Sequence, residues 1–62
     1  MKWRNISDTA MRCDPWTIAK VWIQGRATYE LWHDKRPVMV GSYSTFEQAN
    51  AVALREEQAG QA

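Results

Sequence analysis

The pattern of apolar and polar residues changes near residue 16. Before it, most residues are polar, and the few large apolar side chains are unevenly spaced. After it, runs rich in β-branched and aromatic residues alternate with short polar segments, which is typical of strands and turns. We therefore expect a loosely structured N-terminal arm, residues 1–15, and a single domain, residues 16–62. The large apolar residues of the arm are Trp3, Ile6 and Met11.

Three β-strands are predicted in the first part of the domain. Two long runs of β-forming residues flank a segment that contains Gly25, and this arrangement favours a hairpin. A second turn contains Pro37, and the strand after it ends at Gly41. The pattern predicts a three-stranded antiparallel meander. Its strands are residues 16–23, 27–33 and 38–40, and its turns are 24–26 and 34–37.

A helix is predicted over residues 45–58. Ser44 and Glu47 have the spacing of a capping box, in which the Ser hydroxyl accepts the Glu backbone N–H and the Glu carboxylate accepts the Ser N–H. Good helix formers follow, and Gly60 is a stop signal. The expected fold class is α+β, with the β-meander packed against this C-terminal helix in the order β-β-β-α. The expected core side of the helix carries Phe46, Ala49, Val52 and Ala53.

The register of the first hairpin decides which residues face the helix. A three-residue turn pairs Lys20 with Glu30, and a four-residue second turn pairs Leu31 with Val40 and Trp32 with Met39. The helix-facing set is then Ala19, Val21, Ile23, Tyr29, Leu31, Val38 and Val40. A two-residue first turn is the alternative: it moves Trp22 into the core with Tyr29 and Leu31, and Lys20 must then extend its ammonium group to solvent.

In the first of these registers the opposite face is unusually apolar. It carries Ile18, Lys20, Trp22, Thr28, Glu30, Trp32 and Met39. One interpretation is that the arm folds over this face and buries Trp22 and Trp32 with its own apolar residues. The other is that the face binds a partner, since contiguous exposed apolar area marks interaction sites. The predicted partner-binding residues are Trp22, Trp32, Ile18, Lys20 and Met39.

The composition changes this picture through its tryptophans, which are four of 62 residues. Trp suits either a small core or a contact surface. With one cysteine and one histidine, the chain lacks the residues for an internal disulfide or a four-ligand zinc site. Catalytic sets and phosphate-binding loops are also missing from the sequence. We therefore expect no enzyme activity, no cofactor, no metal and no small-molecule substrate.

The formal charge of +1 argues against a dedicated non-specific nucleic-acid binder. Cations nevertheless dominate residues 1–26, and acids dominate residues 27–62. A sheet with cations between aromatic rings can contact phosphates and stack on bases. Nucleic acid is therefore the alternative partner, and the residues predicted to bind it are Lys20, Arg26, Lys35 and Arg36.

The sequence contains no apolar run long enough for a membrane span and does not begin like a secretory signal. We expect a cytoplasmic chain without a membrane partner.

One junction resembles known families. The run from Val40 to Ala49, preceded by Tyr29-Glu30-Leu31-Trp32, is similar to the strand-to-helix junction of AP2-type DNA-binding domains and of the arm-binding domains of tyrosine integrases. This resemblance covers about residues 16–58 and implies a three-stranded sheet that lies in the DNA major groove. The junction also resembles half of a SPOR peptidoglycan-binding domain, which implies glycan binding. The opening from Lys2 to Ser7, with Trp16 to Lys20, is similar to small phage and prophage proteins.

These observations favour a small non-enzymatic binding module of phage or prophage origin. The leading hypothesis is that its Trp-bearing sheet face binds a protein or a second copy of the chain. DNA binding by the three-stranded sheet is the alternative, and glycan binding is a lesser one.

Overall fold

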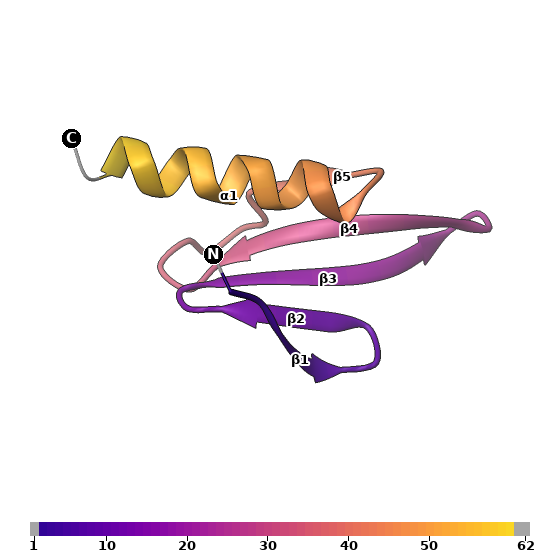
Figure 1. The fold of residues 1–62 in the computed structure, drawn as a ribbon. Helices are drawn as coiled ribbons and strands as arrows, with labels where there is room; N and C mark the ends of the chain where they lie inside the picture. The colour runs from indigo at the N-terminus through magenta and orange to yellow at the C-terminus, as the bar shows by residue number, and fades with distance from the viewer. Residues whose placement is uncertain (1, 61–62) are drawn as a thin grey trace.

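The computed structural model of the chain describes residues 2–60 and has one antiparallel sheet with one C-terminal helix (Figure 1). The predicted α+β class is therefore confirmed. The sheet has five strands rather than three, and each pairs with the next along the chain. The elements are β1 (Arg4–Ser7), β2 (Ala10–Cys13), β3 (Trp16–Ile23), β4 (Arg26–His33), β5 (Gly41–Tyr43) and α1 (Phe46–Gly60).

The two additional strands come from the segment predicted to be a loose arm, and that prediction was wrong. β1 and β2 form a hairpin that continues the sheet beyond β3, with Met11 opposite Ile18. The arm therefore extends the sheet at its edge and does not fold over Trp22 or Trp32. Strands of four residues have too few alternating positions to stand out in the sequence, and β1 is interrupted by a bulge between Asn5 and Ser7.

The long β3–β4 hairpin has a two-residue turn, Gln24–Gly25. Both residues have positive φ, 52° at Gln24 and 77° at Gly25, as a type I′ turn requires. The ladder therefore pairs Ile18 with Leu31 and Lys20 with Tyr29. The three-residue register, which pairs Lys20 with Glu30, was wrong, and the alternative register is the one found. Trp22 is exposed, however, and does not join the core as expected for that register. Charge pairing was the weaker signal because the twist of the strands favours the I′ turn.

The last strand lies three residues later than predicted. Leu31 pairs with Gly41 and not with Val40, and the N–H of Val40 donates to the Leu31 carbonyl at the entry to the ladder. Gly41 ended the strand in the sequence interpretation, but in the structure it begins β5. A Cβ at Gly41 would collide with the Tyr43 ring, so glycine leaves room for that ring beside the strand.

Helix α1 begins at Phe46, one residue later than the predicted start at residue 45. The backbone N–H of Gln48 donates to Thr45 Oγ1 at 3.2 Å, which makes Thr45 the N-cap. The Gln48 side chain returns to the chain before the helix, where its Oε1 accepts the Ser44 N–H at 3.1 Å. The capping residues are thus Thr45 and Gln48, each one position after the predicted pair, but the Gln48 side chain accepts the N–H of Ser44 and not that of the N-cap as in a standard capping box.

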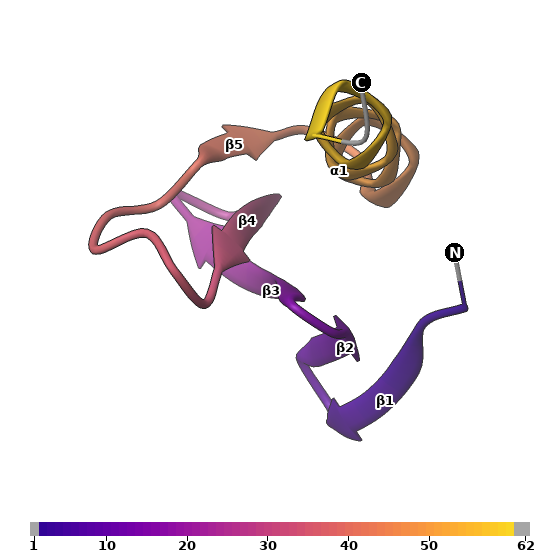
Figure 2. The ribbon, with the colours of Figure 1, turned by 90° about the vertical axis from the view of Figure 1, so that its left-hand side faces the viewer.

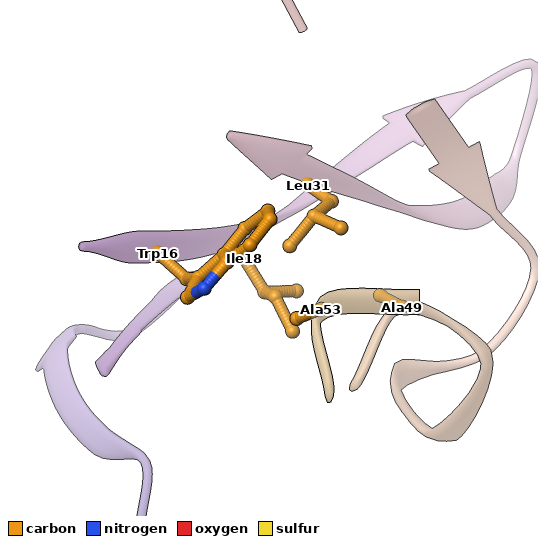
Figure 3. Close-up of a cluster of buried hydrophobic side chains, with 5 residues drawn as sticks. All are labelled: Trp16, Ile18, Leu31, Ala49 and Ala53. Carbon is orange, nitrogen blue, oxygen red and sulfur yellow. The ribbon is translucent and has the colours of Figure 1, made fainter. Parts of the chain in front are cut away.

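The core lies between α1 and the face of the sheet that it covers, here the covered face. Ala49 and Ala53 of the helix are fully buried, and their small side chains let it approach β3 and β4 closely (Figure 3). Phe46 and Val52 pack at the margin, so the predicted core side of the helix is confirmed. The large buried side chains of the sheet are Trp16, Ile18 and Leu31. The predicted helix-facing residues Ala19, Val21 and Ile23 instead point away from the helix, on the open face.

The sheet curves so that the N-terminal segment approaches the helix from the side opposite to β5 (Figure 2). Trp3 makes this contact: its Nε1 donates to Asn50 Oδ1 at 2.7 Å, and its ring meets the Phe46 ring edge-on. Farther along the helix, Trp16 Nε1 donates to Glu57 Oε1 at 2.7 Å. Two tryptophans thus attach the helix to the sheet through hydrogen bonds as well as packing.

Candidate binding surface

The four tryptophans occupy different environments. Trp16 is buried, with 1% of its surface exposed, and Trp3 is half-buried against the helix. Trp22 and Trp32 are 65% and 39% exposed. Trp16 and Trp3 therefore stabilise the fold, whereas Trp22 and Trp32 expose part of their rings to solvent.

The two exposed tryptophans do not share a face. Trp22 pairs with Ala27, on the side of the sheet that carries Ile18, whereas Trp32 pairs with Thr17 on the open face. The predicted face that combined Trp22 with Trp32 is therefore not formed. The shift from a three-residue to a two-residue turn is the reason, because it moves each residue of β4 to the other face relative to β3.

The remaining residues of the predicted partner surface are also separated. Ile18 is 2% exposed and belongs to the core, so a partner cannot contact it without opening the fold. Met39 lies in the connection between β4 and β5 and is half-buried. Lys20 does adjoin Trp22: its Nζ lies 5.1 Å from the centroid of the Trp22 ring, within the range of a cation–π contact.

Trp22 belongs to a part of the β3–β4 hairpin that the helix does not cover. In Figure 1 this hairpin continues past the first turn of α1. Ile23 is next to Trp22, points to the opposite face and is 53% exposed, although the sequence interpretation placed it in the core. Arg26 pairs with Ile23 at the turn and is exposed. We call Trp22, Ile23 and Arg26 the hairpin tip.

A groove adjoins the hairpin tip on the covered face. Its volume is about 130 Å³, and it lies between the β1–β2 turn and the first turn of α1. Its apolar lining includes Met11, Tyr29 and Phe46, and its charged residues are Asp8 and Lys20. Lys20 links the two features, because it lines the groove and also contacts the Trp22 ring. We call this hollow the tip-side groove.

No protein-family model, curated protein or solved structure matches the chain. The functional interpretation therefore depends on the surface itself. In residues 2–60 no helix combines the length and apolar character needed to cross a bilayer. The same residues contain no group of three or more His, Cys, Asp or Glu side chains arranged to hold a metal ion.

The four cations predicted to bind nucleic acid do not form one surface. Lys20 is on the covered face, and Arg26 is at the hairpin tip. Lys35 and Arg36 follow the other end of β4, and Arg36 Nη2 is 2.8 Å from Glu56 Oε1 in an ion pair. The structure thus distributes these cations over both ends of the hairpin and pairs one of them with the helix.

The open face carries a charged cluster centred on Arg12. Its guanidinium contacts Asp34 with both Nη atoms, Asp14 through Nε at 2.6 Å, and Thr17 Oγ1 at 2.8 Å. Hydrogen bonding from the Arg12 guanidinium is the chief cause that holds the pKa of Asp34 below its ordinary value. The hydrogen bond to Asp34 likewise raises the pKa of Arg12. The cluster joins β2 to the segment after β4, and its two carboxylates neutralise Arg12.

A second groove, of about 480 Å³, lies at the opposite end of the sheet from the hairpin tip. Its charged residues are of both signs, and its walls include the Trp16 and His33 rings, which meet edge-on with centroids 4.6 Å apart. The Trp16–Glu57 hydrogen bond and the Arg36–Glu56 ion pair both lie along it. Its polar groups therefore already serve to hold the helix on the sheet.

Proposed function

We propose that the protein is a non-enzymatic binding module that recognises a protein surface through the hairpin tip. The observation that carries this proposal is the exposure of Trp22 and Ile23, two large apolar neighbours on a ribbon that projects past the helix. Burying such side chains in a partner contributes about 1.5–3 kcal/mol each, which gives the tip a strong tendency to associate.

The chemistry of the tip supports protein recognition in particular. Trp and Arg are the residue types most enriched among those that dominate the energy of protein interfaces, and the tip contains both. The mixture of an aromatic ring, an aliphatic side chain and one cation is typical of an interface centre with a polar margin.

The rigidity of the hairpin adds to this argument. β3 and β4 are paired along their whole length, from Trp16–His33 to Ile23–Arg26, and the two-residue turn closes the ladder. A partner therefore meets a backbone that is already held in place, so little backbone conformational entropy is lost on binding.

The proposal is tested by capturing partners from a lysate and then measuring their affinities after purification. Immobilised wild-type protein, the double variant Trp22→Ser/Ile23→Thr and the control Val38→Ser are incubated with a bacterial lysate, and retained proteins are identified and then purified. Val38 is a suitable control because it is 68% exposed and lies far from the tip, between β4 and β5. We expect the dissociation constant of a purified partner to rise at least about thirtyfold in the double variant and to stay unchanged in the control.

Two outcomes contradict the proposal. One is a set of purified partners whose affinity is the same for all three proteins. The other is steeply salt-dependent binding to duplex DNA that Arg26→Glu abolishes, which would assign the tip to nucleic acid instead.

A further inference from the structure

We propose that the β1–β2 hairpin is a flap that opens as a unit while β3, β4, β5 and α1 stay folded, and that Trp3 holds this flap closed. The flap is defined as residues 2–13, which contain Trp3, β1 and β2. The inference goes beyond the proposed function and does not depend on it. It concerns which part of the fold opens first and which surfaces that opening uncovers.

The buried core that the structure describes contains no residue of the flap. Its members come from β3, β4 and α1 and are Trp16, Ile18, Leu31, Ala49 and Ala53. In residues 2–15 every side chain is half-buried or exposed, and all four residues of β1 are exposed. Opening the flap therefore leaves this cluster assembled, although it uncovers the side of Ile18 that lies next to Met11 in the ladder.

The flap is attached to the rest of the fold mainly along one edge. In the elements that the structure describes, the backbone of α1 approaches β3, β4 and β5 but not β1 or β2. Figure 2 shows β1 at the edge of the curved sheet farthest from β5. Each strand of the flap has four residues, and a bulge interrupts the pairing of β1 with β2. Because a two-stranded hairpin is at best marginally stable alone, the flap depends on its contacts to stay closed.

Two side-chain contacts hold the flap, one on each side of the sheet. On the covered face, Trp3 Nε1 donates to Asn50 Oδ1 at 2.7 Å, and the Trp3 ring meets the Phe46 ring edge-on. On the open face, Arg12 donates to Asp34 through hydrogen bonds that are exposed to solvent. Exposed ion pairs contribute little to stability, whereas Trp3 also buries apolar surface against the helix. Trp3 is therefore the stronger of the two contacts.

Opening of the flap changes two surfaces at once. The Lys20 N–H donates to the Thr9 carbonyl at 2.6 Å, so departure of the flap leaves this N–H and the adjoining edge of β3 unpaired. The tip-side groove loses the wall that β1, β2 and their turn provide. The groove therefore exists only in the closed form, and the open form has a free strand edge, which is a template for pairing with a further strand.

Hydrogen exchange of the wild-type amides, followed by nuclear magnetic resonance under native conditions, tests separate opening. Relative to their rates in an unfolded chain, the flap amides are expected to exchange at least about tenfold faster than the slowest amides of the β3–β4 ladder. The Lys20 N–H is the sharpest reporter, because it belongs to β3 but donates to the flap. It is expected to exchange like the flap amides. Equal protection of the flap and the ladder overturns the proposal.

A pair of helix variants distinguishes flap opening from global unfolding. Arg55 is exposed within α1, and Arg55→Gly is expected to speed exchange of the ladder amides about two- to fivefold relative to the control Arg55→Ala. The flap amides should exchange equally fast in both variants, because the weakened helix affects the closed and open forms alike. An equal acceleration of the flap and the ladder amides would mean that they open together, and would overturn the proposal.

The role of Trp3 is tested in the same experiment. Trp3→Phe keeps a ring against the helix but removes the hydrogen bond to Asn50, and it is expected to speed exchange of the flap amides about fivefold. Trp32→Phe, on the open face, is expected to leave them unchanged. Flap amides that exchange equally fast in the wild type and in Trp3→Phe would overturn the assignment of Trp3. These measurements need no partner, so their outcome is independent of the binding tests of the hairpin tip.

Discussion

Ile18 and Ile23 lie on the same strand, yet the structure gives them opposite environments. Ile18 is on the covered face under the helix and is buried, whereas Ile23 is on the open face beyond the helix and is exposed. Trp16 and Trp22 differ in the same way although they share the covered face. At the scale of single residues, then, two variables decide the role of a side chain: the face on which it lies and its distance from the helix.

The isoleucine pair gives a matched test of this assignment. Ile18→Val removes one methylene group from a packed core and is expected to lower the free energy of unfolding by about 0.5–1.5 kcal/mol. Ile23→Val removes the same group from a solvent-exposed position and is expected to change the free energy by less than about 0.5 kcal/mol. Urea unfolding followed by circular dichroism measures both. Equal effects would contradict the register of β3.

The Arg12 cluster predicts a dependence of stability on pH. The pKa of Asp34 is lowered in the folded state by its hydrogen bonds from Arg12, so the folded protein holds the ionised form more strongly than the unfolded chain does. This stabilisation is complete above the unfolded pKa, about pH 4, and is lost as the pH falls through the lower folded pKa.

Urea midpoints of the wild type and Asp34→Asn, measured from pH 7 to pH 2, test this dependence. We expect the wild type to be the more stable of the two at pH 7, and the difference between them to shrink as Asp34 becomes protonated below about pH 4. A difference that is constant over the whole range would show that the carboxylate charge has no part in the effect.

At the scale of elements, the ends of strands and helices were the hardest to predict. The sequence contained the correct capping signal, but Ser44-x-x-Glu47 and Thr45-x-x-Gln48 overlap, and spacing alone does not choose between them. The β3–β4 turn had the same ambiguity. Gln24 is not among the residues that prefer positive φ, so the local sequence does not mark Gln24–Gly25 as a two-residue turn, whereas a three-residue turn pairs Lys20 with Glu30.

The helix cap can be assigned by two substitutions. Thr45→Ala removes the acceptor of the Gln48 N–H and is expected to lower the free energy of unfolding by about 1 kcal/mol. Ser44→Ala leaves that bond intact and is expected to have less than half this effect. Thermal unfolding of the two variants distinguishes them, and a larger effect at Ser44 would restore the cap that the sequence first suggested.

The turn offers a stabilising change. Gln24→Asn introduces a residue that adopts positive φ more readily and creates Asn-Gly, the preferred pair for a type I′ turn. We expect the free energy of unfolding to rise by about 0.5 kcal/mol, as is common for such local improvements. A decrease in stability would indicate that the turn has a different conformation.

At the scale of the whole molecule, the sequence was sufficient for the fold class and insufficient for the surface. The central hairpin could be predicted from its long runs of β-forming residues, and the C-terminal helix from its cap spacing and helix-forming residues. Ala49 and Ala53 were correctly placed in the core. The contact surface could not be predicted, because it depends on which side chains the helix leaves uncovered. No local pattern predicts that Trp22 lies beyond the first turn of α1.

Substitution of Trp3 tests how much the contact between the N-terminal segment and the helix contributes to stability. Trp3→Phe retains a ring against Phe46 but removes the hydrogen bond to Asn50, and it is expected to lower the free energy of unfolding by about 1 kcal/mol. Trp32→Phe, on the open face, serves as the control because Trp32 donates no side-chain hydrogen bond in residues 2–60 of the structure, and little change is expected. Chemical denaturation measures both, and equal effects would show that the Trp3 bond contributes nothing.

The order of the strands in the sheet has a consequence for the speed of folding. Because every strand pairs with its neighbour in the chain, most contacts of the sheet join nearby residues, and each hairpin closes only a short loop. Such chains fold rapidly, here on the order of milliseconds or faster. The contacts between the helix and the rest of the chain join distant positions instead, and among their hydrogen bonds Trp3–Asn50 spans 47 positions, compared with 41 for Trp16–Glu57. The Trp3–Asn50 contact should therefore form last, after the helix has docked, and break first when the protein unfolds.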